Sequence, residues 1–320
     1  MRDMADRDNE WDVQPAPSRV VAIGDLHGDV RAFGAIGRAC GLVDEDGGWT
    51  GGSAHVVLMG DLMGGDDSRL LIHAVMRLER EARGAGGRVH TLIGNYDLLP
   101  VLGRLRRLTR KERRSYGKND FRKDGPYSEW LRSRPTIVKI GSTVFVHAGL
   151  GRRVLETGPG EVNAQVRAWI AYDQGVGPKP PGETRWTVDE NYGPMWTRAF
   201  KARGGRLNPG PSKKAMREIL DGLGAERMVL GHAPTRTGIV TEHPHYGDSV
   251  VMVDTSISDD RRGRLGALVI ERGALATVYA EDRADGEALR EREKREAGRP
   301  PAFFARLRQA VARLFGGRRA

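Results

Sequence analysis

Six side chains of the types that bind metal ions each follow a run of β-forming residues. The runs lie at residues 19–23, 55–59, 88–93, 136–146 and 227–230, and the polar residues after them are Asp25 and His27, Asp61, Asn95, His147 and His232. In an open α/β sheet, ligands bind beyond the carboxyl ends of the strands, so we expect these side chains to converge. A single Asp or Asn after Gly is ordinary turn chemistry, and a single strand-end His is usually structural. Their recurrence at five strand ends favours one shared site.

The donor set combines carboxylates, an amide and imidazoles. Such a mixture suits first-row transition metals such as Mn, Fe or Zn better than Ca or Mg. Two ions held close together, with one carboxylate bridging them, lower the pKa of a shared water and clamp an in-line displacement at phosphorus. The sequence therefore predicts two divalent or trivalent transition-metal ions as cofactors.

The pattern of helices and strands around these residues predicts an α/β fold. Three strand–helix units with Gly-terminated turns predict parallel strands joined by right-handed crossovers, with helices near residues 30–40 and 68–83. A hairpin is expected within 136–146, and further strands at 227–230, 249–253, 265–271 and 274–280. We expect a disordered leader at 1–17 and one domain at 18–282, which contains a basic segment at 104–134 and a helical insertion at about 150–225. The tail at 283–320 is expected to form a charged helix and a basic amphipathic helix.

Five short motifs resemble those of the calcineurin-like metallophosphoesterase superfamily. They are Gly24-Asp25-Leu26-His27-Gly28, Gly60-Asp61, Gly94-Asn95, His147-Ala148-Gly149 and Gly231-His232. Residues 127–150, 193–198 and 253–258 further resemble the Shewanella-like branch of the phosphoprotein phosphatases. The resemblance implies a four-layer α-β-β-α sandwich with two facing sheets.

The resemblance also implies a role for each site residue. Asp25 and His27 would bind the first metal and Asp61 would bridge, whereas the second metal would be held by Asn95, His147 and His232. Arg198 and Asn95 would bind phosphate oxygens, a task that suits the planar fork of an arginine. The implied activity is hydrolysis of phosphomonoesters by a metal-bridging hydroxide, in an enzyme like the serine/threonine or tyrosine protein phosphatases.

Two departures from the family pattern fall on the same catalytic partnership. The second motif of the family continues Gly-Asp-x-x-Asp-Arg-Gly, but here Gly64 and Gly65 take the places of the second Asp and the Arg. The family's His after Asn, thought to be the general acid that this Asp orients, is replaced by Tyr96. A positioned general acid contributes about 10²–10⁴-fold, so we expect attenuated activity that favours aryl phosphates such as phosphotyrosine. Tyr96 is itself a candidate acid, although an unperturbed phenol titrates near pKa 10.

The space that the missing Asp and Arg leave could be refilled by Arg69, Asp66 or Asp67, whose directions the sequence does not fix. Two other functions compete with the phosphatase reading. One is a phosphate-binding pseudophosphatase or scaffold that keeps the metals, and the other is a hydrolase of dinucleoside polyphosphates.

The net charge of +10 is concentrated in two segments. Residues 104–134 contain twelve Lys or Arg against four Asp or Glu, and residues 299–320 contain six Arg and no acid. The first segment is expected either to concentrate anionic substrate at the rim of the site or to be an ordinary solvated face. Nucleic acid is the least favoured partner, because no RNA- or DNA-binding motif accompanies these charges.

The last segment could bind an anionic membrane surface or a protein partner. It places six apolar side chains on one helical face: Phe303, Phe304, Leu307, Val311, Leu314 and Phe315. No stretch approaches the roughly 18 apolar residues of a membrane span, and the N-terminus has no apolar signal region. Cys40 is the single cysteine, so no intrachain disulfide is expected. These features predict a cytoplasmic protein that is peripheral at a membrane if its last helix binds there.

Overall fold

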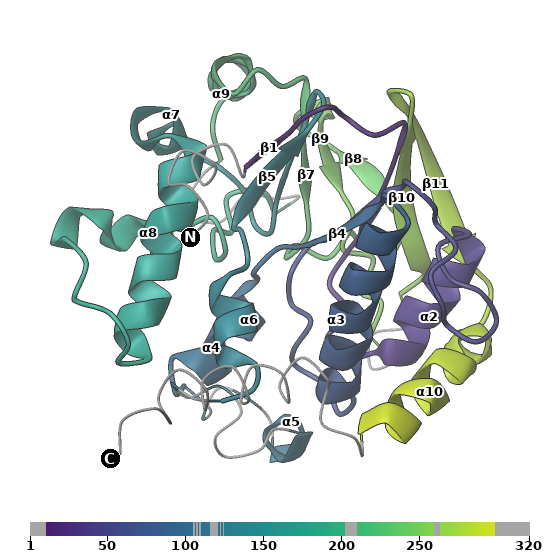
Figure 1. Ribbon diagram of the computed structural model, residues 1–320. Helices are drawn as coiled ribbons and strands as arrows, with labels where there is room; N and C mark the ends of the chain where they lie inside the picture. Colours follow the sequence, from purple (N-terminus) through teal and green to yellow (C-terminus); the bar gives the residue numbers. More distant parts are fainter. Residues whose placement is uncertain are drawn as a thin grey trace, which may run out of the picture.

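Two β-sheets stacked face to face occupy the centre of the computed structural model, and helices cover their outer faces (Figure 1). The structure describes residues 11–104, 106, 108, 110–115, 121, 123, 125–201, 210–258 and 263–297. The two stacked sheets and the helices on their outer faces confirm the expected four-layer α-β-β-α architecture.

The first sheet has five strands in the order β11-β10-β2-β3-β4. Its bounds are β2 at Arg19–Ile23, β3 at His55–Leu58, β4 at Arg88–Thr91, β10 at Leu265–Glu271 and β11 at Ala274–Ala280. Strands β2, β3 and β4 are parallel, and the connections between them contain helices α2 (Val30–Ala39) and α3 (Ser68–Gly84). These are the strand–helix units that the Gly-terminated turns predict.

The second sheet has six strands in the order β1-β5-β6-β7-β9-β8. Its bounds are β1 at Asp12–Val13, β5 at Ile137–Ile140, β6 at Thr143–Val146, β7 at Arg227–Leu230, β8 at Thr241–His243 and β9 at Gly247–Met252. The hairpin expected within 136–146 is the antiparallel pair β5–β6, whereas β6, β7 and β9 run parallel.

The end of the expected leader belongs to the fold. Residues 11–17 are described, and Asp12–Val13 pairs in parallel with β5. The Asp12 carboxylate lies 2.9 Å from the Lys139 ammonium, which ties this edge strand to its neighbour. The expectation that all of residues 1–17 are disordered is therefore wrong for residues 11–17, which the structure describes.

Alternating side chains of β2 show how the layers are built. Val20 and Ala22 face the second sheet, in a core that also contains Phe145 and Val229. Val21 and Ile23 point the other way, into the core beneath α2 and α3. A strand that is buried on both faces in this way reads as a continuous apolar run, as residues 20–23 do.

The remaining helices lie at the rims and on the outer faces. They are α4 (Asn95–Val101), α5 (Arg110–Ser115), α6 (Ser128–Arg132), α7 (Arg153–Thr157), α8 (Pro159–Asp173), α9 (Lys213–Gly222) and α10 (Glu287–Ala297), with 3₁₀ helices η2 (Gly182–Val188) and η4 (Arg283–Gly286). Elements α7, α8, η2 and α9 lie within the range expected for the insertion, and α10 lies where the charged helix is expected. The amphipathic helix expected at the end of the chain lies outside the described residues. Within the described part, no helix is both long enough and apolar enough to cross a membrane.

Candidate metal centre

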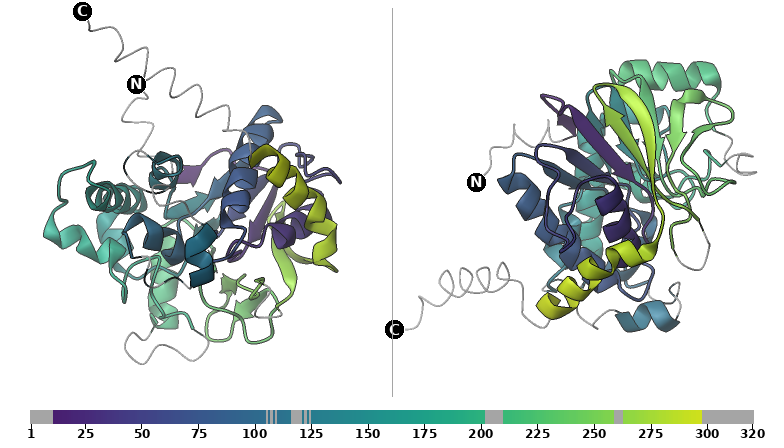
Figure 2. Two further views of the ribbon diagram at one scale, coloured as in Figure 1. Left: turned by 90° about the horizontal axis from the view of Figure 1, so that it is seen from below. Right: turned by 90° about the vertical axis from the view of Figure 1, so that its right-hand side faces the viewer.

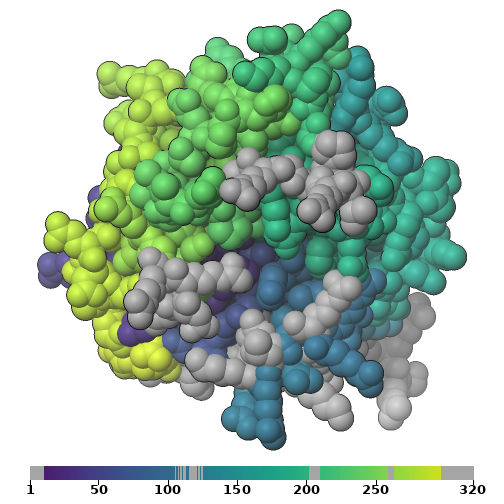
Figure 3. Space-filling view, turned by 180° about the vertical axis from the view of Figure 1, so that it is seen from behind, coloured from purple at the N-terminus to yellow at the C-terminus, as the bar shows by residue number. Residues whose placement is uncertain are grey.

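The residues that follow β2, β3, β4, β6 and β7 meet at one edge of the paired sheets. Five of the six expected ligands are buried and His27 is partly exposed. Two groups of three donors have their ligand atoms within 4.8 Å of one another: Asp25, His27 and Asp61 in the first, and Asp61, His147 and His232 in the second. On the face seen in Figure 3, residues coloured purple and blue form the bottom of a recess that lies below residues coloured green. Asp61 belongs to both groups, which is the arrangement that a bridging carboxylate requires.

Asp61 lies between two imidazoles. Its Oδ2 atom is 3.9 Å from Nε2 of His27 and 3.5 Å from Nε2 of His147. Its other oxygen, Oδ1, accepts a hydrogen bond of 2.7 Å from the backbone N–H of Tyr96. The carboxylate is therefore held by one oxygen and presents the other to the space between the histidines.

Both of these imidazoles are oriented by backbone carbonyls. The Nδ1 atom of His147 donates to the Met59 carbonyl at 2.8 Å, and that of His27 lies 3.1 Å from the Met63 carbonyl. A proton on Nδ1 leaves the lone pair on Nε2, the atom that faces Asp61 in each case. This is the second-sphere contact that metal-binding histidines usually have.

Asp25, Asn95 and His232 complete the cluster. Both carboxylate oxygens of Asp25 accept from the His232 backbone N–H, at 3.1 and 3.0 Å. Oδ1 of Asn95 lies 3.0 Å from Nε2 of His147. Among the described residues, Nε2 of His232 is buried with no hydrogen-bond partner. A buried nitrogen without a partner is costly, and a metal ion would satisfy it. The donor set and this orphaned atom together fit a pair of transition-metal ions.

Three of the six residues have left-handed backbone. The φ angles are 42° at His27, 51° at Asp61 and 59° at His232. A non-glycine residue held in this region costs on the order of 1 kcal/mol, and such strain clusters at functional sites. The strain is maintained by loops that approach one another closely.

Glycines permit that approach. A Cβ atom on Gly94 would lie 2.2 Å from Oδ1 of Asp61, and one on Gly231 would lie 2.4 Å from Oδ1 of Asp25. Both contacts are far inside van der Waals distance, so only glycine fits beside each carboxylate. The Gly that precedes Asn95 and the Gly that precedes His232 are thus part of the site's construction.

Burial shifts the pKa of the cluster's acids upward and that of its imidazoles downward. Desolvation and then the charge of Asp254 raise the pKa of Asp25 well above its ordinary value, and desolvation and then Asp97 do the same for Asp61. Desolvation lowers the pKa of His147 to about 3 and that of His232 well below its ordinary value. Burial and mutual repulsion disfavour the charged forms of these carboxylates, and cations bound beside the neutral imidazoles would stabilise those forms.

Arg198 supplies positive charge beside this cluster. Its side chain is exposed, and its charge lowers the pKa of Asp61, His147 and His232. The segment that carries it is fixed to the His147 loop, because the N–H groups of Ala148 and Gly149 both donate to the Pro194 carbonyl. Sequence reasoning placed this arginine near phosphate, and the structure places it at the edge of the cluster.

Tyr96 lies against the first group of donors. Its ring packs edge-on against His27, with centroids 4.9 Å apart. It is the second residue of α4, directly after Asn95, so the residue that replaces the family's His stands beside the site.

Two buried carboxylates were missed as functional residues. Asp97 accepts from the N–H groups of Asp61 (2.8 Å), Met63 (3.0 Å) and Gly94 (2.9 Å), and burial raises its pKa to about 6. Asp254 follows β9 and raises the pKa of Asp25 and Asp61. The signal for Asp97 was its place three residues after the Gly that precedes a helix, which is the acidic position of a capping box.

The glycines that replace the family's Asp and Arg allow the two ligand loops to touch. A Cβ atom on Gly65 would lie 2.0 Å from the His27 carbonyl oxygen. The N–H of His27 donates to the Asp61 carbonyl, and that of Gly28 to the Leu62 carbonyl, both at 2.8 Å. Asp67 does not refill the vacated space, because its carboxylate pairs with Arg290 of α10 at 2.5 Å.

The basic segment at 104–134 is described in part. Three of its arginines bond to other side chains of the protein: Arg104 to Glu190, Arg132 to Gln174 and Arg134 to Glu79. These contacts hold α6 and the neighbouring loop to the body of the protein. A rim that attracts substrate stays a prediction for the segment.

Comparisons with known proteins agree on one family. The model for calcineurin-like phosphoesterases matches residues 18–236. Shewanella-like protein phosphatase 2 of Arabidopsis thaliana is 27% identical over 76% of this chain and 72% of its own length. Shewanella-like protein phosphatase 1 of Plasmodium berghei is 26% identical over 78% and 70%. A solved cold-active protein-tyrosine phosphatase of a psychrophilic Shewanella species has a TM-score of 0.67 at 24% identity, over 82% of this chain and 80% of that one. The last likeness is one of fold.

Proposed function

Because the chain belongs to the calcineurin-like phosphoesterase family, we propose that it is a phosphatase that hydrolyses phosphomonoesters with two transition-metal ions. The family match confirms the resemblance that the five motifs predict. What goes beyond the family is the assignment of residues, ions and substrate, and each is argued from the contacts around Asp61.

We assign the two metal positions to the two donor groups. Asp25, His27 and Asp61 hold the first ion, and Asp61, Asn95, His147 and His232 hold the second. When bound, the ions supply an activated water as nucleophile and stabilise the charge that develops on the phosphoryl group. Imidazole and carboxylate together favour Mn, Fe or Zn.

Arg198 and Asn95 bind and orient the phosphoryl group in this proposal. The guanidinium offers several N–H donors in a fixed plane, which match the oxygens of a phosphate. Its charge lowers the pKa of Asp61, His147 and His232, so it acts on groups that belong to both proposed metal positions. Tyr96 lines the same site and would stand beside the leaving group.

We propose aryl phosphates as the favoured substrates, with a phosphorylated protein or a small molecule as the natural one. Tyr96 occupies the position of the family's acidic His, and glycines occupy those of the partnered Asp and Arg. A phenolate leaves without needing a full proton, so aryl esters suffer least from these replacements. The Shewanella structure, described as a protein-tyrosine phosphatase, agrees with this preference.

One observation supports the proposal more than any other: Oδ2 of Asp61 faces Nε2 of both His27 and His147. The test is hydrolysis of p-nitrophenyl phosphate with Mn²⁺ by the wild type and by Asp61→Asn. We expect turnover by the wild type and its loss in the variant. If neither protein hydrolyses the ester but both still bind phosphate, the enzyme reading is wrong. The chain would then be the phosphate-binding pseudophosphatase that the altered acid position also suits.

A further inference from the structure

The C-terminal segment of the described chain lies along α2 and α3, and reaches from the residues that precede both helices to Glu81 near the end of α3. Helix α10 runs beside both helices in each view (Figure 2), and its Leu289 is buried. A Cβ atom on Gly286 would lie 1.8 Å from the Arg31 carbonyl oxygen, so η4 touches the backbone of α2. Glu293 bonds to Arg77 of α3 at 2.8 Å. This docking brings two arginines to the two ligand-bearing loops.

The first contact is made by Arg283 on Asp29. Nε of Arg283 donates to Oδ2 of Asp29 at 2.9 Å, and its Nη2 donates to the Ile257 carbonyl. The other oxygen of Asp29 accepts from Ala32 at 2.9 Å and so caps α2. The Asp29 side chain is 9% exposed, so this charge-assisted bond is largely withdrawn from water. Asp29 comes two residues after His27.

The second contact is made by Arg290 on Asp67. Nε of Arg290 lies 2.5 Å from Oδ2 of Asp67, the residue that precedes α3 and ends the loop after Asp61. The side chain of Asp67 makes no cap bond to its own helix, which leaves it to Arg290. Each ligand loop of the first metal position therefore ends in an aspartate held by the same C-terminal segment.

We propose that Arg283 and Arg290 are positioning residues for the first metal position, an inference that rests on the proposed function. His27 and Asp61 lie in left-handed backbone, which persists only where the surroundings enforce it. The loops already hydrogen-bond to each other, so fixing their far ends at Asp29 and Asp67 fixes the pair as one unit. The second position draws His147 and His232 from β6 and β7, on the other sheet, and is expected to depend less on α10.

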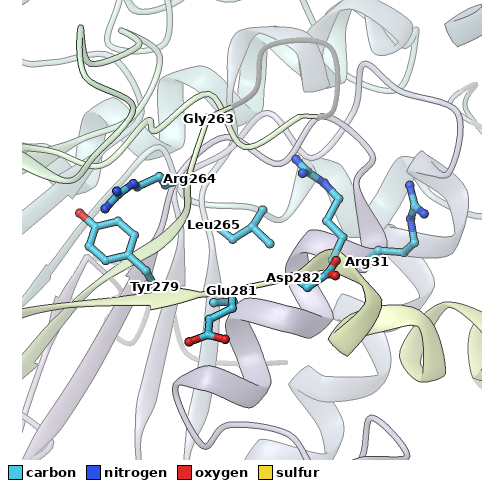
Figure 4. Close-up of a pocket in the computed structure, with 9 residues that line it drawn as sticks. Arg31, Gly263, Arg264, Leu265, Tyr279, Glu281 and Asp282 are labelled. Atoms are coloured by element: carbon cyan, nitrogen blue, oxygen red, sulfur yellow. The ribbon is translucent and has the colours of Figure 1, made fainter.

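Truncation of Arg283 does not open a void in the core. The side chain lines an open cavity of about 720 Å³ between the β10–β11 hairpin and α2, together with Arg31, Tyr279 and Asp282 (Figure 4). Removing it enlarges a space that is already open, so Arg283→Ala tests the bond to Asp29 more than packing. Arg292 is the matched control, because it lies on α10 and bonds to Glu81 and Glu296, away from the ligand loops.

The experiment titrates Mn²⁺ into metal-free full-length protein by calorimetry, and measures kcat and KM at saturating Mn²⁺. Losing a hydrogen-bond partner of a metal ligand costs roughly 10–100-fold in metal affinity, and Arg283 and Arg290 act one step further out, through Asp29 and Asp67. We therefore expect Arg283→Ala and Arg290→Ala each to weaken one Mn²⁺ site about tenfold, with a smaller effect on the other site and KM unchanged. Arg283→Lys and Arg290→Lys should recover part of the Mn²⁺ affinity, and Arg292→Ala should bind Mn²⁺ as tightly as the wild type does.

A double variant separates positioning from general destabilisation. If Arg290 acts through Asp67, then Asp67→Ala with Arg290→Ala weakens Mn²⁺ binding no more than either change alone. Unchanged Mn²⁺ affinity in Arg283→Ala and Arg290→Ala, with a melting temperature lowered as in Arg292→Ala, would reduce both arginines to structural contacts and overturn the inference. A wild type that binds no Mn²⁺ would instead overturn the proposed function, and this inference with it.

Discussion

The two sheets bring different chemistry to the candidate metal centre. The five-stranded sheet supplies Asp25, His27 and Asp61 from loops in which the non-glycine residues His27 and Asp61 have left-handed backbone. The six-stranded sheet supplies His147 and His232, two buried imidazoles with depressed pKa values. The five-stranded side carries both carboxylate ligands, and the six-stranded side adds neutral nitrogen donors beside them.

The two sides are also held in different ways. On the five-stranded side, the loops end in aspartates bonded to the C-terminal segment. On the six-stranded side, the His147 ring reaches across to the carbonyl of Met59, which follows β3 in the opposite sheet. We therefore expect packing of the two sheets to set the proposed second position, and the ends of the loops to set the first. The following changes break or sharpen that difference.

Removing one ligand from each side should have the largest effect. Asp25→Asn and His232→Asn are each expected to lower kcat/KM for p-nitrophenyl phosphate about 10³-fold, roughly 4 kcal/mol in transition-state stabilisation. Each variant should retain a single Mn²⁺ ion, because the other donor group is intact. Metal analysis of the purified variants checks this. Wild-type activity in either variant would show that the ligand from that sheet is not needed for catalysis.

Arg198 belongs to neither side, and its removal should have the second-largest effect on kcat/KM. Arg198→Ala removes charge-assisted bonds to phosphate worth about 1.5–3 kcal/mol, so kcat/KM should fall roughly 10–100-fold with both ions retained. Arg198→Lys should recover only part, because a lysine lacks the planar fork. Steady-state kinetics at saturating Mn²⁺ decide the matter. A loss confined to metal binding would contradict a role in holding phosphate.

Asp97 tests how far the five-stranded side depends on its inner support. Asp97→Asn keeps the shape but weakens the acceptor of three backbone N–H groups around Asp61. We expect roughly tenfold weaker Mn²⁺ binding, with Asp248→Asn on β9 as an exposed control. Affinity equal to the wild type in both variants would mean that Asp97 serves the fold alone.

Tyr96 should matter least for aryl esters. Tyr96→Phe is expected to change the turnover of p-nitrophenyl phosphate by less than about threefold, because this leaving group needs little help from an acid. The same assay on phosphoserine, an alkyl ester, provides the comparison. A hundredfold loss on both esters would make Tyr96 the general acid and would contradict the expected aryl preference.

A histidine pair on β3 and β4, outside the candidate metal centre, affects stability alone. His55 and His90 lie 3.2 Å apart, and burial lowers their pKa values to about 4 and about 3. Below pH 6.5 the unfolded chain therefore binds more protons than the folded one, so stability falls as pH drops toward these values. Each pKa unit is worth about 1.4 kcal/mol before screening by solvent.

We expect the melting temperature of metal-free wild type to fall more steeply from pH 7 to 4 than that of His90→Gln, which lacks one of these groups. Thermal melts at several pH values measure the two slopes. Parallel slopes would show that this pair does not contribute to acid sensitivity.

Much of the fold could be predicted because its signals are local. Apolar runs that end in Gly mark the strands, and the expected bounds of β7, β10 and β11 agree with the structure. The recurrence of donors after these runs also predicts that the six candidate ligands meet at one edge of the sheets. Local pattern and sheet topology together carry this part.

The rest depended on tertiary contacts that no local pattern encodes. Asp12–Val13 is a two-residue strand only because β5 offers it an edge. Asp67 turns toward Arg290, more than two hundred residues away in sequence, and not toward the space left by the family's Asp. Asp97 looked like a helix-start residue, and its inward contacts appear only once the loop after Asp61 lies over it.

The central claim is that one carboxylate, Asp61, joins two metal positions. The most direct measurement is the number of Mn²⁺ ions bound per chain, by elemental analysis after removal of free metal, in the wild type and in Asp61→Asn. The account predicts two ions in the wild type and fewer than one in the variant. A single ion in the wild type, or two ions retained by Asp61→Asn, would contradict it.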